Sequence, residues 1–302
     1  MDSIKIGMIG LDTSHVTAFT KLINDVNHEH HVPGGRVTAA YPGGSPDFPL
    51  SINRVEGFTE ELRNQYGVEI VATPEEVAER CDAILLESAD GRVHLEQFRR
   101  IASYGKPVFI DKPLALKAAD AEEIGRIAAK HGIPVMSASS LRYTDALIAE
   151  LEREGAGMIT GADVHGPMPV EPTQSYYFWY GIHTAEMLFA IMGTGCEEVY
   201  ASSSESHELI TGRWRDGRIG TIRGSRDGSY QFGALVHRTK GSAYINASAA
   251  ARPAYAGLME QVIAMFKTGR PSLNWEETIA IIRFLEKAEE SRTSGAAVRI
   301  HP

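Results

Sequence analysis

Short apolar runs alternate with helix-like segments along residues 1–136, and this alternation constrains the fold more than any other feature. The runs have the length of strands and fall at residues 4–10, 37–41, 69–72, 83–86, 107–110 and 134–136. Apolar runs of this kind are typical of parallel strands, which are buried on both faces and joined by right-handed crossovers. Residues 1–138 are therefore predicted to form a doubly wound α/β domain.

Capping residues mark several of the helices between these strands. Thr73 precedes Pro74 and two glutamates, which is the pattern of a helix start. Gly67 and Gly105 follow segments predicted to be helical, at residues 59–66 and 94–104. A further helix is expected at residues 118–130.

The pattern changes after Arg142. One helix, at residues 145–153, precedes strand-like segments at 158–164, 197–204, 208–214, 218–224, 230–237 and 242–246, and helices at 254–267 and 275–289 close the chain. Asp216-Gly217 between two alternating runs indicates a hairpin. Residues 139–302 are predicted to form an α+β domain with a largely antiparallel open sheet, whose helices gather on one face.

Charge and composition exclude several classes of protein. The chain has 302 residues, 43% of them hydrophobic, with a net charge of −9. A negative balance argues against nucleic acid and anionic membrane surfaces as partners. We also expect no signal peptide and no membrane span, and Cys81 and Cys196 suit a reducing compartment. These features predict a cytoplasmic protein, with Cys81 buried and inert.

The turn after the first strand is where a dinucleotide-binding fold carries its G-x-G-x-x-G motif. Gly10 keeps the first glycine position, while Asp12 and His15 occupy the other two. The second glycine lets the backbone approach a pyrophosphate, which a carboxylate would meet with like charge. Thr13 and Ser14 offer hydroxyl groups, and the following helix offers backbone N–H groups to an anion.

The carboxyl ends of the other parallel strands are further candidate ligand positions. Tyr41, Ser88 and the run from Asp111 to Pro113 lie at such ends. Lys112, directly after a buried strand and before a proline, is placed to bind a substrate hydroxyl and to help move its proton. The alternative is a surface ion pair between Asp111 and Lys112.

His183 is the second catalytic candidate. It stands three residues before Glu186 on a predicted helix, so the carboxylate is placed to orient an imidazole that acts as general base. The alternative is a histidine packed in the core. No metal site is predicted, because this pair lacks an identifiable third ligand and residues 28–31, His-Glu-His-His, fall in an expected solvated loop.

Taken in order, these motifs resemble the Gfo/Idh/MocA oxidoreductases, a family that includes glucose–fructose oxidoreductase and inositol dehydrogenase. Residues 105–115, GKPVFIDKPLA, resemble the family's GK-hydrophobic-EKPLA signature with Asp in place of Glu. Gly181-Ile182-His183 followed by Glu186 resembles its catalytic helix. The resemblance implies a Rossmann domain that binds NAD or NADP, and hydride transfer to or from a secondary alcohol of a sugar, cyclitol or sugar acid. It also implies a second domain whose open sheet faces the substrate or another subunit, and the exposed face of this C-terminal sheet predicts a homodimer or homotetramer.

The resemblance also assigns roles to individual residues. Lys112 is expected to contact the nicotinamide ribose and the substrate, and His183 to take the hydroxyl proton. His94 matches a histidine after the fourth strand, and Arg142 a position after the sixth, near the nicotinamide. The cofactor-binding residues expected are Gly10, Asp12, Thr13, Ser14, His15, Tyr41, Ser88, His94, Asp111, Lys112, Pro113 and Arg142.

Three departures from the family pattern leave alternatives open. Trp179 stands where an aspartate is usual, Tyr41 and Pro42 replace the acid that binds the adenosine ribose, and Asp12 with His15 replaces two glycines. The choice between NAD and NADP therefore stays open. One alternative is a sugar-binding or regulatory module of the same fold that has lost the cofactor site. Another is hydrolysis or elimination with NAD as a resident cofactor.

Overall fold

The computed structural model describes residues 3–249 and 252–301, and its contacts divide the chain into two compact units. The first unit comprises Met1–Ala115, Ala119–Ala138 and Tyr255–Trp275. The second comprises Leu116–Ala118, Ser139–Ala254 and Glu276–Pro302. Each unit has its own sheet.

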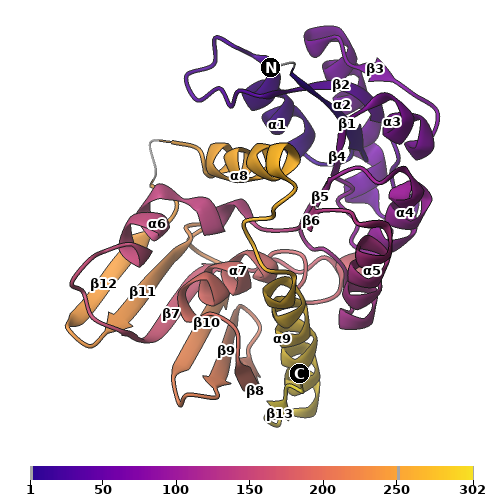
Figure 1. Ribbon diagram of the computed structural model, residues 1–302. Helices are drawn as coiled ribbons and strands as arrows, with labels where there is room; N and C mark the ends of the chain where they lie inside the picture. Colours follow the sequence, from indigo (N-terminus) through magenta and orange to yellow (C-terminus); the bar gives the residue numbers. More distant parts are fainter. Residues whose placement is uncertain (1–2, 250–251, 302) are drawn as a thin grey trace. The chain divides into compact units, whose positions relative to one another are not determined.

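The first unit is built on six parallel strands in the order β3-β2-β1-β4-β5-β6 (Figure 1). The strands are β1 (Ile4–Ile9), β2 (Gly35–Tyr41), β3 (Glu69–Ile70), β4 (Ala83–Leu86), β5 (Val108–Ile110) and β6 (Val135–Met136). This order is that of the doubly wound dinucleotide-binding fold, with its ligand crevice at the carboxyl ends of the strands. The predicted fold class of this part is confirmed.

The helices of this part follow the predicted alternation, with one large difference. They are α1 (His15–Asn24), α2 (Pro49–Tyr66), α3 (Pro74–Arg80), α4 (His94–Ile101) with the short η1 (Ala102–Tyr104), and α5 (Ala118–His131). Thr73 caps α3 as predicted, its hydroxyl oxygen accepting the Glu76 N–H at 3.2 Å. Helix α2 begins ten residues earlier than predicted. Its buried residues are only Ser51, Thr59 and Leu62, so its first half carries almost no apolar periodicity.

Residues 255–275 group with the first unit, whereas the sequence assigned them to the second domain. They include most of α8 (Ala254–Thr268). The ring of Tyr255 lies edge-on to His15 at 5.0 Å and to Phe19 at 5.4 Å. Trp275 packs so closely on Gly125 that a Cβ there would lie 2.2 Å from the indole nitrogen. Periodicity identifies such a helix but does not say which core it joins.

The second unit is built on a seven-stranded sheet in the order β12-β11-β7-β10-β9-β8-β13. The strands are β7 (Ile159–Pro167), β8 (Cys196–Ser203), β9 (His207–Trp214), β10 (Ile219–Ser225), β11 (Gly233–Arg238), β12 (Gly241–Asn246) and β13 (Val298–Arg299). All neighbours are antiparallel except β7 and β10, so the largely antiparallel sheet is confirmed. The predicted hairpin is the turn between β9 and β10, where Gly217 has φ +86°.

One face of this sheet is covered by helices. The unit contains η2 (Ser140–Tyr143), α6 (Asp145–Leu151), η3 (Pro172–Gln174), α7 (Gly181–Met192) and α9 (Trp275–Ser294). Gly220 and Gly212 pair across β10 and β9; the first lies against Leu188 of α7 and the second against Phe284 of α9. Leu209 and Tyr244 are exposed elsewhere on this sheet. Among the helices described, none combines the length and the apolar character that a membrane crossing requires.

Candidate functional site

The turn after β1 depends on Gly10. Its φ is +87°, and an added Cβ would lie 2.3 Å from the hydroxyl oxygen of Ser88 and 2.6 Å from the Ser88 backbone nitrogen. The Gly10 and Leu11 N–H groups bond to the carbonyl oxygens of Tyr41 and Pro42, at 2.9 and 2.6 Å. The glycine is therefore required by the close approach of the loops that follow β1 and β4.

Asp12 points into the interior of the first unit. Its side chain is fully buried, with Oδ1 accepting the Ala89 N–H at 2.9 Å and Oδ2 accepting the Ser51 hydroxyl at 2.5 Å. Burial raises the pKa of this carboxyl above its ordinary value, against the lowering effect of these two hydrogen bonds. The structure thus gives Asp12 a role in holding the loops together, in place of the cofactor contact expected from the sequence.

The remaining residues of the turn lead into α1. Thr13 is nearly buried, and its hydroxyl oxygen lies 3.4 Å from the His15 backbone nitrogen. Ser14 occupies the N-cap position of α1 and is exposed. An exposed hydroxyl beside the first turn of a helix is placed to meet an anion together with the helix N–H groups.

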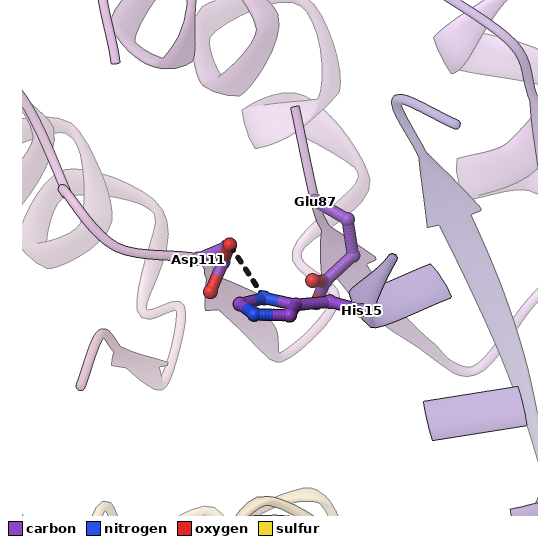
Figure 2. Close-up of side chains that lie close together, drawn as sticks. All are labelled: His15, Glu87 and Asp111. Atoms are coloured by element: carbon purple, nitrogen blue, oxygen red, sulfur yellow. Dashed lines mark hydrogen bonds and ion pairs between the residues drawn. The ribbon is translucent and has the colours of Figure 1, made fainter. Parts of the chain in front are cut away.

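Three ionisable side chains converge at the carboxyl end of the sheet, as Figure 2 shows. His15 opens α1, Glu87 follows β4 and Asp111 follows β5. His15 Nδ1 lies 2.9 Å from Asp111 Oδ2, and the imidazole stacks on Phe19 at 5.2 Å. The sequence predicted His15 and Asp111 as separate cofactor contacts, and it placed Glu87 at a strand end where ligands bind without assigning it a role. The carboxyl ends of adjacent parallel strands lie at one edge of a sheet, and this rule could have predicted that the three side chains lie close together.

The two carboxyl groups of this cluster behave differently. Burial raises the pKa of Glu87 well above its ordinary value, and the neighbouring Asp111 raises it further. Burial also acts to raise the pKa of Asp111, but the charge and hydrogen bond of His15 hold it below its ordinary value. The pKa values of these two neighbouring carboxyl groups are therefore shifted in opposite directions.

Ser88 and His94 connect the loops around this edge. The Ser88 hydroxyl donates to Gln97 at 2.9 Å. The buried His94 ring lies between two backbone carbonyl oxygens, with Nε2 2.7 Å from Ser88 and Nδ1 3.0 Å from Leu114. Both predicted site residues therefore hold the strand-end loops in place. Tyr41 and Lys112 are half-buried at the ends of β2 and β5, and Pro113 is buried.

His183 lies in the second unit, on α7. Its Nδ1 is 2.7 Å from the hydroxyl oxygen of Ser139. The rings of Tyr180 and Phe232 stand edge-on to the imidazole at 5.6 and 5.7 Å. Trp179, at the position where an aspartate was expected, is half-buried and tilted against Tyr180.

Glu186 does not have the partner predicted from its spacing. Its carboxylate accepts a hydrogen bond from Arg142 Nε at 2.8 Å, and Arg142 Nη1 forms an ion pair with Glu277 at 2.7 Å. Burial raises the pKa of Glu186, although Arg142 acts to lower it. The prediction that Glu186 orients His183 is wrong, because Arg142 binds Glu186 and Ser139, 44 residues before His183, supplies the contact to the imidazole. Arg142, expected near the nicotinamide, is buried between two carboxylates.

Comparisons with known proteins agree with this architecture. Residues 4–139 match a family described as an oxidoreductase family with an NAD-binding Rossmann fold. No curated protein matches the sequence.

Several solved structures share the fold over nearly the whole chain. The scyllo-inositol dehydrogenase of Lactobacillus casei, solved with bound NAD(H) and scyllo-inositol, superposes with a TM-score of 0.80 at 16% identity, covering 99% of each chain. Myo-inositol 2-dehydrogenase of Lactobacillus plantarum gives 0.79 at 17% identity, over 99% of this chain and 100% of that one. A myo-inositol dehydrogenase of Corynebacterium glutamicum gives 0.76 at 18%, over 100% of both. At these identities the likeness shows the fold.

Proposed function

We propose that this chain, whose residues 4–139 match the Gfo/Idh/MocA oxidoreductase family, transfers a hydride between NAD or NADP and a secondary alcohol. The observation that carries this proposal is the inward position of Asp12, which bonds to Ala89 and Ser51. The one substitution that opposes a pyrophosphate by charge is thereby turned away from the surface of the turn. The fold relatives that act on inositols support a sugar, cyclitol or sugar acid as substrate.

The residues present suit a dinucleotide at the carboxyl end of β1. Gly10 permits the close loop packing, and the exposed Ser14 with the N–H groups of α1 suits an anion. The cofactor, when bound, supplies the hydride acceptor or donor. Tyr41 ends β2 where an acid would bind a ribose 2′-hydroxyl, so this position carries no charge against a 2′-phosphate. Both NAD and NADP therefore belong in the tests.

We assign proton transfer to Lys112 and His183. The ammonium group of Lys112 is suited to bind the reacting oxygen, and an imidazole titrates in the range that proton transfer requires. Ser139, 2.7 Å from Nδ1 of His183, orients the ring and sets which nitrogen carries the proton. In this scheme Ser139 is a positioning residue, and Arg142 with Glu186 anchors η2 to the helix that carries His183.

Turnover of a polyol panel tests the proposal. The purified protein is mixed with NAD or NADP and a set of inositols, aldoses and sugar acids, and nicotinamide absorbance is followed. We expect reduction of the cofactor with at least one polyol and its loss in Lys112→Met and His183→Asn. Thermal stabilisation by sugars alone, with no effect of either dinucleotide, would instead identify a sugar-binding module.

The exposed apolar residues of the second unit bear on assembly. Leu209, Ile219 and Tyr244 are exposed on strands of its sheet, with 42, 54 and 58% of their surface accessible. We propose that this sheet joins copies of the chain into a homodimer or homotetramer, which light scattering of the purified protein measures. We place the reaction in the cytoplasm, where nicotinamide cofactors are exchanged between enzymes.

A further inference from the structure

We propose that His15, Glu87 and Asp111 bind a divalent transition-metal ion at the carboxyl end of the parallel sheet. One ligand atom from each residue, a ring nitrogen and two carboxylate oxygens, lies within 4.8 Å of the other two (Figure 2). All three residues are in the first unit, in the segments that follow three different strands, β1, β4 and β5. This site goes beyond the proposed hydride transfer, which needs no metal.

The distances and the ligand types suit such an ion. Ligand atoms about 2.1 Å from a metal stand roughly 3–3.5 Å apart in octahedral or tetrahedral geometry. His15 Nδ1 and Asp111 Oδ2 are 2.9 Å apart, close to the octahedral value. One imidazole with two carboxylates is a donor set for Zn²⁺, Mn²⁺, Fe²⁺ or Co²⁺, whereas Ca²⁺ and Mg²⁺ prefer oxygen ligands alone.

Glu87 is the observation that separates this cluster from an ordinary set of acids. Its side chain is fully buried, and within residues 3–249 and 252–301 neither of its carboxylate oxygens has a hydrogen-bond partner. Asp111 is buried too, and its Oδ1 likewise meets no donor in the described part of the chain. Burying carboxyl oxygens without partners is costly, and a divalent cation offsets that cost.

Other buried carboxylates in this protein are satisfied by donors. Asp12 accepts from Ser51 and Ala89. Glu208 accepts from Tyr177, Ser203 and Arg226 at 2.7–2.8 Å. Glu87 differs from both of these acids, and it lies against a histidine already held in place.

The surroundings hold the imidazole in position for a ligand. Phe19 stacks on the His15 ring at 5.2 Å and Tyr255 meets its edge at 5.0 Å. Three protein ligands leave a coordination position for an oxygen of water or of a small molecule, as in catalytic rather than structural zinc sites. Because Lys112 follows Asp111 in the chain, an oxygen bound there would be polarised beside the proposed catalytic lysine.

Titration with Co²⁺ and Zn²⁺ tests the site without any nucleotide. The full chain is stripped with a chelator, and Co²⁺ is added while its visible absorption bands are recorded; Zn²⁺ then displaces it. We expect one ion per chain, with bands typical of nitrogen and oxygen ligands. Glu87→Gln keeps the shape of the side chain and is expected to weaken binding by at least about 100-fold, since loss of an outer partner alone costs 10–100-fold.

A surface control distinguishes this site from adventitious histidine binding. His28→Ala with His30→Ala removes part of the metal-like run at residues 28–31 and is expected to leave Co²⁺ affinity unchanged. Absence of stoichiometric binding to the wild type overturns the proposal, and this result does not depend on whether a variant folds. Equal binding by wild type and Glu87→Gln, or loss of binding in the surface control, overturns it as well.

The outcome is independent of the proposed oxidoreductase function. Co²⁺ bound at one equivalent with no NADH or NADPH binding would retain the metal site and remove the hydride transfer. NADH binding with no metal uptake would do the reverse.

Discussion

Replacement of Asp12 by asparagine tests whether the altered turn is compatible with a dinucleotide. Asp12→Asn removes the charge and keeps the shape, and its carbonyl oxygen still accepts the Ala89 N–H that Asp12 binds at 2.9 Å. Because the carboxylate faces Ser51 and Ala89 inside the unit, its charge should have little effect on a pyrophosphate. We expect the Kd for NADH, measured by nicotinamide fluorescence, to change less than about threefold.

The size of the change in NADH affinity distinguishes an Asp12 carboxylate that faces the pyrophosphate from one that faces the interior of the unit. A carboxylate about 4 Å from a phosphate interacts by roughly 4 kcal/mol at an effective dielectric constant near 20, which corresponds to about a thousandfold in affinity. A charge about 10 Å away, screened by water, contributes roughly 0.4 kcal/mol, or about twofold. If Asp12→Asn tightens NADH binding by tenfold or more, the inward orientation of the carboxylate is refuted.

The stability of the same variant has a defined pH dependence. Burial raises the pKa of Asp12 above its ordinary value of 3.8, so the folded protein holds this proton more tightly than the unfolded chain. Wild type therefore loses stability from this group as the pH rises from 3.8 through the raised pKa, and the variant does not. The Tm of Asp12→Asn should therefore rise relative to that of the wild type as the pH increases over that range. A difference that stays constant with pH would show that Asp12 titrates normally.

Three further variants probe the proton-transfer residues and the buried ion pair. Lys112→Met should lower kcat/KM for any polyol substrate by about 10²–10⁴-fold with little change in Tm, whereas an unchanged kcat/KM removes Lys112 from catalysis. Ser139→Ala should lower kcat more than it raises KM and should shift the pH profile of kcat, because it releases His183; a loss confined to Tm would mean that the contact is only structural. Glu186→Gln leaves the buried Arg142 with one carboxylate and should destabilise the fold by about 3 kcal/mol in urea unfolding, with NADH affinity unchanged. A loss of kcat at unchanged stability would contradict this structural role of Glu186.

The sequence predicted the first sheet well because its strands are short apolar runs with turn residues between them. Ala83–Leu86 and the helix cap at Thr73 are local signals, and the structure has both where they were expected. The start of α2 was missed because Pro49 opens a helix whose exposed first turns carry no apolar pattern. Tyr255 and Trp275 belong to the first unit because they pack on its residues, and these tertiary contacts have no local signal in the sequence.

The site residues were found by position, and their partners were not. His183 was identified from its motif, but its contact with Ser139 spans 44 residues and leaves no local trace. From the sequence, Asp12 was interpreted as a substitution that weakens a phosphate-binding loop. Its two hydrogen-bond donors, the Ser51 hydroxyl and the Ala89 N–H, lie far along the chain and could not be foreseen. In the sequence, Glu87 is simply the residue after a strand. Its closeness to His15 and Asp111 follows from the strand order, in which β4 lies between β1 and β5.

A negative charge placed at Ser14 is the most direct test of the claim that a dinucleotide binds at residues 10–15. Ser14→Asp puts a carboxylate at the exposed start of α1, where a negative charge interacts favourably with the helix dipole, so the fold should be as stable as wild type or more so. If a dinucleotide pyrophosphate binds at this turn, the same change should weaken NADH and NADPH by about 10–100-fold in fluorescence titrations. Ser204→Asp, on an exposed serine of the second unit, is the control and should leave both affinities unchanged. Tight NADH binding that Ser14→Asp does not alter, or no binding by wild type at millimolar concentration, would contradict a dinucleotide site at residues 10–15.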